Sequence, residues 1–202
     1  EIGASSPRYL KNLSSLYPES NIIGIDIVIN NIKKINNCRL KNIKYYYEDI
    51  QNPSPMFVGK KFDLIICSDV LAHIQDDIIS LENIYKLLAG GGILYLHTPT
   101  KIWHRIFNES KRFNMESFDM VRPGYDMSII KNILKQIGFD ICRSNYTNRF
   151  LGRLVWELEQ KANKYRLMTK LIFPFLSICS RLDSLIGGKG NGFSLICKKN
   201  EK

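Results

Sequence analysis

The stretch FDLIICSDVLAHIQDDIISLENIYKLLAGGGILYLHTP, residues 62–99, decides the fold that we expect for this chain. It opens with a near-continuous apolar run at 62–67, of the kind that is buried on both faces of a parallel sheet. Apolar residues then recur at helical spacing over 76–88, and a second apolar run follows at 93–97. Between them stand Gly90–Gly92, which we expect to end the helix. The strand, helix and strand predict a right-handed crossover between two parallel strands.

The same alternation continues on both sides of this stretch. Helices are expected at 7–17, 30–36 and 128–137, and strands at 21–28, 43–47, 139–144 and 193–198, with a largely helical, basic and apolar stretch between 150 and 186. This order predicts an α/β fold with a doubly wound, Rossmann-like sheet. We expect residues 1–150 to form the core of one domain, and 151–202 to add a helical insertion and a terminal strand to that same domain.

The composition fits a single folded domain. Hydrophobic residues make up 45% and charged residues 24% of the 202 residues, which allows a proper core and excludes a wholly disordered chain. The net charge of +10 would favour an anionic partner. However, the chain is rich in Lys, Ile and Asn together, as an AT-rich genome would produce, and it contains no block of Arg and Lys and no nucleic-acid-binding motif. We therefore do not expect a nucleic-acid partner.

The five cysteines are scattered and include no C-x-x-C pair. This pattern predicts neither a zinc site nor a disulfide framework, and we expect no bound metal. Reduced thiols fit a cytoplasmic protein. Cys67 and Cys197 lie within apolar runs, so we expect both to be buried as small hydrophobic side chains.

Small and acidic residues follow several predicted strands, at the edge where open α/β sheets bind their ligands. The turn from Glu1 to Pro7 enters a helix, and its backbone N–H groups could hold an anionic group such as a carboxylate. Asp26 follows at about the 20-residue spacing at which a carboxylate accepts the ribose hydroxyls of a nucleoside, with a helix cap as its alternative role. Asp49 could accept a hydrogen bond from an adenine amino group; a cap is again the alternative, and Glu48 is a rival.

Two histidines are candidates for proton transfer. His73 lies just beyond the end of the predicted strand 62–67, where it could orient a substrate or accept a proton. Its alternative is a structural role beside the start of a helix. His97 ends the next predicted strand, and either ring could act as a general base for an oxygen acceptor. An amine or a phenolate acceptor would need no base.

Together with EIG at 1–3, GIDI at 24–27 and EDI at 48–50, residues 62–99 resemble the class I S-adenosylmethionine-dependent methyltransferases of the methyltransferase type 11 kind. Those enzymes commonly read FDLI-x5-LEHI-x-D, then a helix, LLKPGG and a strand. The resemblance implies a seven-stranded sheet in which the last strand is antiparallel. In this sequence, most of the first strand of that sheet is expected to be cut away. The resemblance also implies the cofactor S-adenosyl-L-methionine, held by residues at the strand ends: Glu1, Gly3, Ser5, Asp26, Ile27, Asp49, Ile50 and Ser68.

The sequence departs from the family pattern in its first turn and before His73. Ser5 and Pro7 stand where the family has later glycines, and Ala72 replaces the usual Glu. These departures motivate a second hypothesis, a catalytically silent methyltransferase-like binding module. A nucleotide-dependent dehydrogenase or epimerase is a third, but the chain lacks the full G-x-G-x-x-G motif and a Tyr-x-x-x-Lys pair.

The acceptor is expected to bind between the irregular segment 98–125 and the C-terminal helices. Candidate acceptor-binding residues are His97, Arg105, Arg122 and Tyr125. Arg122 could pair with a carboxylate or phosphate, and packing at the surface or in a lid is the alternative role for each. The C-terminal part resembles a subgroup associated with bacterial surface-glycan or lipid-linked sugar genes, which implies a small-molecule, glycan or lipid-linked acceptor.

The stretch 167–186 has an apolar centre with basic residues on either side, Lys170 and Arg181. It is too short and too interrupted to cross a membrane, but it could lie at the inner face of one, where basic residues meet anionic lipid. A helical hairpin that covers the sheet or forms a homodimer contact is the alternative that we favour. We therefore expect a cytoplasmic protein, with peripheral membrane contact and a homodimer as open alternatives.

Overall fold

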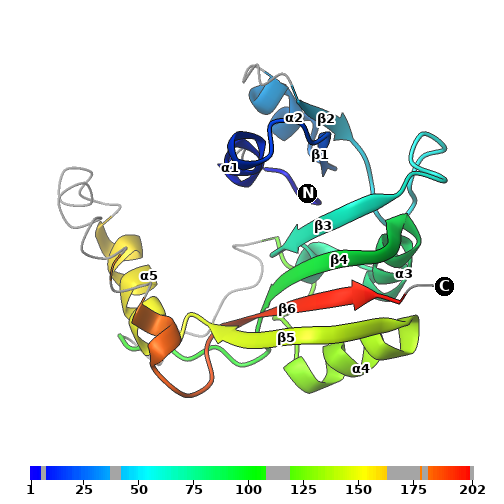
Figure 1. Cartoon of the computed structure of the whole chain (residues 1–202). Coiled ribbons are helices and arrows are strands. Elements are labelled where there is room, and N and C mark those ends of the chain that lie inside the picture. The colour runs from blue at the N-terminus through cyan, green and yellow to red at the C-terminus, as the bar shows by residue number, and fades with distance from the viewer. Residues whose placement is uncertain (6–7, 37–41, 108–118, 163–177, 179–181, 201–202) are drawn as a thin grey trace.

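The computed structural model describes residues 1–5, 8–36, 42–107, 119–162, 178 and 182–200 (Figure 1). In chain order its elements are α1 (Arg8–Leu16), β1 (Ile22–Asp26), α2 (Ile29–Asn36), β2 (Ile43–Tyr47), β3 (Phe62–Ser68), the 3-10 helix η1 (Leu71–His73), α3 (Asp77–Leu87), β4 (Leu88–Pro99), α4 (Met127–Ile137), β5 (Phe139–Thr147), α5 (Phe150–Ala162), the 3-10 helix η3 (Asp183–Leu185) and β6 (Gly192–Lys199). Helices and strands alternate as the hydrophobic pattern predicts.

The strands form two parts that Ile2 joins. β1 and β2 pair in parallel, and the other four strands have the order β3-β4-β6-β5. β3 and β4 are parallel, whereas β6 runs antiparallel to both of its neighbours. Ile2 bridges in parallel to Ile25 of β1 and to Cys67 of β3. The expected Rossmann-like α/β fold is therefore confirmed, the last strand is antiparallel as expected, and Ile2 occupies a place between β1 and β3.

Helices cover both faces of the sheet. On one face, α3 and α4 bury the main core against β3, β4 and β6, in which Leu94 and Leu195 are fully buried. On the other face, Leu10 of α1 packs against Ile43 of β2. Because successive side chains of a strand point to opposite faces, His97 lies on the face opposite to Leu94.

β4 begins earlier than the sequence pattern predicts. It starts at Leu88, directly after α3, and Gly90–Gly92 lie inside it. The pairing of β4 with β3 shifts register across these glycines, and Gly91 has φ +73°, which glycine adopts without the steric cost of a side chain. The prediction that the glycines end the helix is wrong, because α3 already stops at Leu87.

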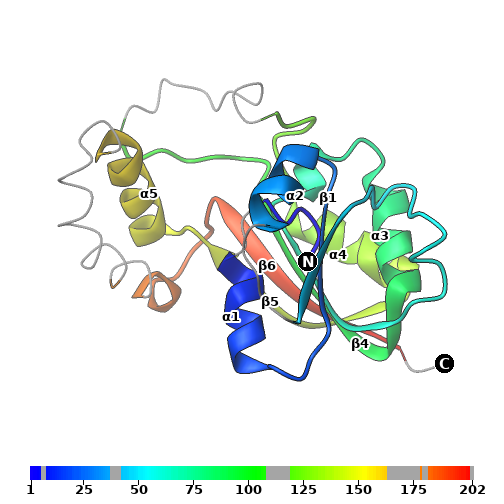
Figure 2. The same ribbon diagram turned by 90° about the horizontal axis from the view of Figure 1, so that it is seen from above.

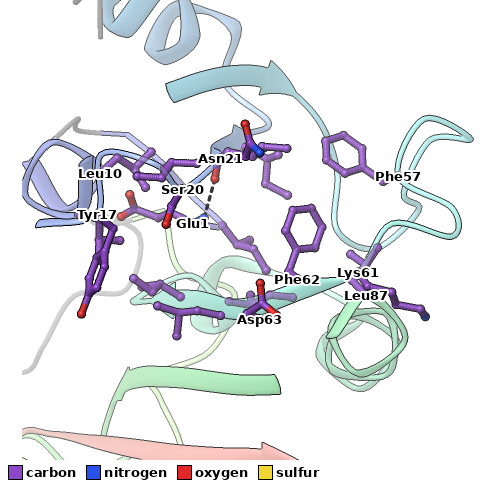
Figure 3. Close-up of a pocket in the computed structure, with 18 of the residues that line it drawn as sticks. Glu1, Leu10, Tyr17, Ser20, Asn21, Phe57, Lys61, Phe62, Asp63 and Leu87 are labelled. Carbon is purple, nitrogen blue, oxygen red and sulfur yellow. Dashed lines mark hydrogen bonds between the residues drawn. The ribbon is translucent and has the colours of Figure 1, made fainter. Parts of the chain in front are cut away.

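A cavity of about 590 Å³ lies between β1 and β3, next to Ile2 (Figure 3). Its walls are mainly apolar side chains from α1, β1 and β3, including Leu64, which is 44% exposed although it lies within a strand. The amino group of Glu1 donates to the carbonyl oxygen of Ile23 at 2.8 Å. Among the described residues, no strand separates β1 from β3 along the remainder of their lengths.

The C-terminal strand returns to the middle of the four-stranded part, because β6 lies between β4 and β5. α5 follows β5 directly and stands apart from the sheet, beyond the carboxyl ends of the parallel strands (Figures 1 and 2). Most of the stretch 167–186, with its predicted membrane or homodimer contact, lies outside the described residues. Within the described part of the chain, no helix is both long and apolar enough to cross a membrane. Cys67 and Cys197 are fully buried, as their apolar surroundings predict.

Candidate active site

The first turn of the chain is shaped around Gly3. Gly3 has φ +71°, and a Cβ atom there would lie 2.3 Å from Cγ2 of Val70, so both the backbone angle and the lack of space require glycine. The N–H of Ala4 donates to the carbonyl oxygen of Ile25 at 2.9 Å, which fixes the turn against β1. Ser5 is exposed at the end of the described turn. The turn thus packs closely against the side chain of Val70 in the loop after β3.

The carboxylate of Glu1 is held inside the protein. Its Oε2 atom is buried and has no hydrogen-bond partner among the residues that the structure describes. Burial raises the pKa of this carboxyl group to about 7, partly opposed by the positive chain terminus beside it. Because a buried polar group without a hydrogen bond is costly, Glu1 fits a ligand that brings a cation or a hydrogen-bond donor.

Asp26, at the end of β1, is almost fully buried, with 6% of its surface exposed. Its Oδ1 accepts from the backbone N–H of Val28 at 2.7 Å, and its Oδ2 accepts from Nδ2 of Asn31 at 3.2 Å. Asp26 therefore stabilises the start of α2, which is the capping role considered for it. Each carboxylate oxygen has a further lone pair, so ribose hydroxyls can bind beside these contacts. The neighbouring Ile27 is 58% exposed and offers an apolar surface at the same strand end.

The loop after β2 distinguishes Asp49 from its rival. The oxygens of Glu48 accept from the backbone N–H of Ser54 at 2.8 Å and from its hydroxyl at 2.7 Å, and Glu48 is buried. Asp49 is half-buried and accepts from the backbone and side chain of Gln51 in its own loop. This difference favours Asp49 as the carboxylate that reaches a ligand. Ile50 packs its side chain into the main core, so a contact of Ile50 with a ligand would have to be made by its backbone.

Arg122 and Tyr125 anchor the segment before α4. The guanidinium of Arg122 forms an ion pair with Asp77 of α3 and donates to the hydroxyl of Tyr125 at 2.7 Å. It also donates to the carbonyl oxygen of Gln75 at 2.8 Å, and the hydroxyl of Tyr125 donates to Asp77 at 2.6 Å. Burial, with the acceptor Asp77 as the next cause, raises the pKa of Tyr125 well above its usual range. These contacts are the packing role considered for both residues, and a role in acceptor binding stays a prediction.

His73 lies in η1, next to this anchor. Its Nδ1 is 3.0 Å from the carbonyl oxygen of Asp119. Because a carbonyl oxygen can only accept, this contact assigns the proton of the neutral ring to Nδ1 and a lone pair to Nε2. The ring is exposed, so His73 keeps the chemistry of a proton acceptor.

His97 has a partner at each ring nitrogen. Its Nδ1 lies 2.8 Å from Oδ1 of Asp69, and its Nε2 lies 2.8 Å from Oγ1 of Thr147. The loop after β3, β4 and the end of β5 therefore meet at this ring. The sequence pattern singles out neither partner, although the position of Asp69 directly after a strand is a signal that could have indicated it. Thr147 comes close only through the pairing of β5 with β6.

Ser68 and Arg105 occupy different parts of this region. Ser68 ends β3, and its hydroxyl donates to Asp69 at 3.4 Å. Arg105 belongs to the segment 100–107, which runs to α5. The backbone N–H groups of Ile106 and Phe107 donate to Glu157 of α5 at 2.6 and 2.9 Å, so Arg105 is placed beside α5.

The predicted cofactor-binding residues gather at one edge of the sheet. Glu1 and Gly3 adjoin the bridges of Ile2, and Asp26, Asp49 and Ser68 lie at or just after the carboxyl ends of β1, β2 and β3. Carboxylates, a tight glycine turn and an exposed isoleucine suit a ligand with an amino-acid part and a nucleoside part. Within the described ranges, no group of three or more His, Cys, Asp or Glu side chains could hold a metal ion.

A family model described as a methyltransferase domain matches residues 1–138, which include all of these strand ends. The chain belongs to this methyltransferase domain family. The resemblance carried by the motifs at 1–3, 24–27, 48–50 and 62–99 is thereby confirmed. No curated protein matches the sequence.

Solved structures share the fold of the whole chain. Phosphoethanolamine N-methyltransferase 2 from Haemonchus contortus, in complex with S-adenosyl-L-methionine, matches with a TM-score of 0.68 and 17% identity over 99% of this chain and 48% of that one. The N-methyltransferase NodS from Bradyrhizobium japonicum WM9, in complex with S-adenosyl-L-homocysteine, matches with a TM-score of 0.59 and 16% identity over 100% of this chain and 76% of that one. The [4+2]-cyclase SpnF matches with a TM-score of 0.62 and 14% identity over 100% of this chain and 74% of that one. This likeness shows the fold, and the methyltransferase chain described here spans about half the length of the Haemonchus enzyme.

Proposed function

We propose that this methyltransferase binds S-adenosyl-L-methionine at the carboxyl ends of β1, β2 and β3 and transfers its methyl group to a small-molecule, glycan or lipid-linked acceptor. The observation that carries the proposal is the turn at Gly3 beside the buried carboxylate of Glu1, within the region that the family model matches. The carboxylate of Glu1 suits the ammonium group of an amino acid, whereas the N–H groups of Ile2, Ala4 and Ser5 already donate to carbonyl oxygens within the protein.

The next two strand ends suit the nucleoside. Asp26 offers carboxylate oxygens to ribose hydroxyls, and the exposed Ile27 offers an apolar surface to a flat base. Asp49 can accept from an adenine amino group, and the backbone N–H of Ile50 can donate to a ring nitrogen. Ser68 stands at the following strand end, next to the loop that carries Asp69.

The protein has a limited chemical task in this reaction. When bound, S-adenosyl-L-methionine supplies a methyl group that is already activated by a positive sulfonium. The residues of the chain therefore bind, orient and exclude water, and the in-line placement of the reacting atoms can account for much of the acceleration.

The acceptor class is supported by the resemblance of the C-terminal part and by the region beyond the strand ends. There, Trp103, two residues before Arg105 in the sequence, meets Trp156 of α5 edge to face with ring centroids 5.8 Å apart. Aromatic rings with a guanidinium suit a sugar or an anionic small molecule. Peripheral membrane contact of 167–186, the less favoured alternative to packing, would bring a lipid-linked acceptor to this side of the enzyme.

Calorimetric titration with S-adenosyl-L-methionine and S-adenosyl-L-homocysteine tests the proposal. We expect micromolar binding that Asp26→Asn weakens roughly 10- to 100-fold, because hydrogen bonds to a charged group contribute about 1.5–3 kcal/mol. The asparagine keeps an oxygen for the N–H of Val28, so α2 keeps its cap. Asp140→Asn is the matched control, since Asp140 is exposed at the start of β5, on the opposite edge of the sheet.

Circular dichroism shows whether each variant is folded. A folded wild-type protein that binds neither compound contradicts the proposal and supports the catalytically silent binding module in its place. Equal loss of binding in Asp26→Asn and Asp140→Asn would contradict the placement of the site.

A further inference from the structure

Asp69, His97 and Thr147 form a continuous hydrogen-bonded chain at the carboxyl edge of the sheet. Oδ1 of Asp69 lies 2.8 Å from Nδ1 of His97, and Nε2 of His97 lies 2.8 Å from Oγ1 of Thr147. The backbone N–H of Asp69 also donates to the carbonyl oxygen of His97 at 3.0 Å, so backbone and side chain both tie the carboxylate to the ring. A carboxylate, an imidazole and a hydroxyl in this order are the groups with which a protein removes a proton from a hydroxyl.

The backbone around this cluster is constrained. Asp69 has φ +57°, a left-handed conformation that is costly for a residue with a side chain. On the other side of the ring, a Cβ atom at Gly192 would lie 2.7 Å from Oγ1 of Thr147 and 3.2 Å from Nε2 of His97. A larger residue at 192 would therefore displace the hydroxyl or the ring, and only glycine leaves the cluster intact.

The carboxylate assigns the protonation of the ring. Because a carboxylate accepts, Nδ1 of the neutral ring carries the proton and Nε2 carries a lone pair, which accepts from the hydroxyl of Thr147. The side chain of His97 is 15% exposed and that of Asp69 is 59% exposed, so the ring is shielded but not sealed. Asp69 would also offset the positive charge that the ring gains on taking up a proton.

We propose that Nε2 of His97 accepts the proton of the methyl acceptor, that Asp69 is the positioning residue of this base, and that the acceptor atom is the oxygen of an alcohol or phenol. This inference rests on the proposed function and names the acceptor chemistry of that same site. A hydroxyl is a weak nucleophile until a base takes its proton, whereas a neutral amine already has a free lone pair. The hydroxyl of Thr147 marks the place at Nε2 that the acceptor hydroxyl takes.

The acceptor oxygen forms a bond to the methyl carbon while the bond between this carbon and the sulfonium sulfur breaks, and the electron pair of the broken bond stays on sulfur. The proton of the acceptor hydroxyl passes to Nε2 of His97. The positive charge thus moves from sulfur to the imidazolium beside Asp69, and solvent later takes the proton.

The pH dependence of the methylation rate is expected to come from His97 and not from the titratable groups around it. Among the described residues, Asp69 faces the ring from the loop after β3. Tyr95 lies on the same face of β4 as His97, and Tyr9 of α1 lies near Tyr95. The neighbouring strands β5 and β6 present the uncharged side chains of Thr147 and Ser194. Burial, followed by the charges of Tyr9 and Asp69, raises the pKa of Tyr95, so it stays neutral where histidine titrates. A general base acts only in its unprotonated form, so the methylation rate should rise with pH and then level off.

Release of S-adenosyl-L-homocysteine from S-adenosyl-L-methionine is measured with two sets of probes: the hydroxyl compounds methyl glucoside, glycerol 3-phosphate and phenol, and the amines benzylamine and cyclohexylamine. We expect methylation of a hydroxyl probe. His97→Asn keeps an N–H for Asp69 but lacks Nε2, so it should lower kcat by about 100-fold or more and leave the Kd for S-adenosyl-L-methionine within about 2-fold.

Two further variants separate positioning from structure. Asp69→Asn tolerates the same backbone angle but lacks the charge, and it should lower kcat less than His97→Asn does and shift the rise of the pH profile. Asp140→Asn removes an exposed carboxylate on the opposite edge of the sheet and should change neither value.

Nitrogen NMR of the histidine-labelled protein with S-adenosyl-L-homocysteine reads the ring without any acceptor. We expect the Nδ1–H form in the neutral ring, and a mixture of tautomers in Asp69→Asn. The proposal is overturned if Nε2 carries the proton, if His97→Asn methylates a hydroxyl probe at the wild-type rate, or if only amines react. If no probe is methylated, the test of the proposal rests on the tautomer of the neutral His97 ring alone. Failure to bind S-adenosyl-L-methionine is a separate result that contradicts the proposed function itself.

Discussion

The backbone N–H of Ile2 donates to the carbonyl oxygen of Ile66 at 2.8 Å, and this bond ties the first residues of the chain to β3. On the other side, the N–H of Ile25 donates to the carbonyl oxygen of Glu1 at 2.9 Å. Beyond these residues, β1 and β3 border the cavity of about 590 Å³. Facing strand edges with unpaired backbone groups are a template for another strand, so this cavity has the shape and chemistry of a strand position.

We predict that residues added before Glu1, if they form a strand in this cavity, stabilise the protein. Five apolar, β-branched residues added before Glu1 would pair with both edges and cover Leu64, and they would replace the buried chain terminus, whose pKa burial lowers. We expect the melting temperature to rise by about 2–8 °C, the shift that roughly 1–2 kcal/mol gives in a domain of this size. An extension of equal length that alternates Pro and Asp is the control and should give no rise. Equal melting temperatures for all three proteins would contradict the prediction.

Gly3→Ala should destabilise the fold more than Gly59→Ala. Both glycines have positive φ, +71° and +83°, so both substitutions carry the backbone cost of about 1–2 kcal/mol. A Cβ atom at Gly59 meets nothing within 4 Å, whereas at Gly3 it lies 2.3 Å from Cγ2 of Val70. This clash should add roughly 1–3 kcal/mol to the loss in the free energy of unfolding measured in urea. Adding Val70→Ala to Gly3→Ala should recover part of that loss, and equal losses for the two single variants would refute this account.

Glu1 should make stability fall as the pH rises from about 4.5 to about 7. Burial raises the pKa of its carboxyl group to about 7 in the folded protein, from an ordinary value of 4.5. The folded protein therefore keeps this proton where the unfolded chain has released it, and the free energy of unfolding decreases through this window. The chain terminus, whose pKa burial lowers, acts in the opposite direction in this window, so the comparison with Glu1→Gln isolates the carboxyl group. From pH 5 to pH 8 in urea unfolding, the wild-type protein should lose more stability relative to Glu1→Gln, and equal changes in both proteins would show that another group is responsible.

Tyr125→Phe should lower stability without changing the affinity for S-adenosyl-L-methionine. The hydroxyl links Arg122 to Asp77, and its loss should cost about 1–2 kcal/mol in urea unfolding. Because the pKa of Tyr125 is raised in the folded state, the wild-type protein should also lose stability above about pH 10, where an unfolded tyrosine releases its proton. Tyr17→Phe, at an exposed tyrosine, is the control and should leave both properties unchanged. Weaker cofactor binding by Tyr125→Phe would instead place this residue at the ligand site.

The strand ends that carry the candidate cofactor site could be predicted because their signals are local. A short apolar run followed by an acidic residue is enough to place Asp26 and Asp49 at the edge of a parallel sheet. Gly3 was recognised in the same way, since a small residue between a strand and a helix indicates a tight turn. The later glycines at 90–92 misled because a glycine run predicts a break equally well at a helix end and inside an irregular strand.

The sequence by itself therefore determined the alternation of helices and strands, the Rossmann-like class and the family, because hydrophobic periodicity and short motifs depend on residues close together in the chain. The tertiary structure alone decided which polar side chains become partners. In the folded protein, Glu48 accepts a hydrogen bond from Ser54, and Arg122 and Tyr125 both bind Asp77. Asp69 and Thr147 contact the two ring nitrogens of His97. These contacts depend on the order and register of strands that are distant in sequence, above all on the insertion of β6 between β4 and β5, and no local pattern encodes them.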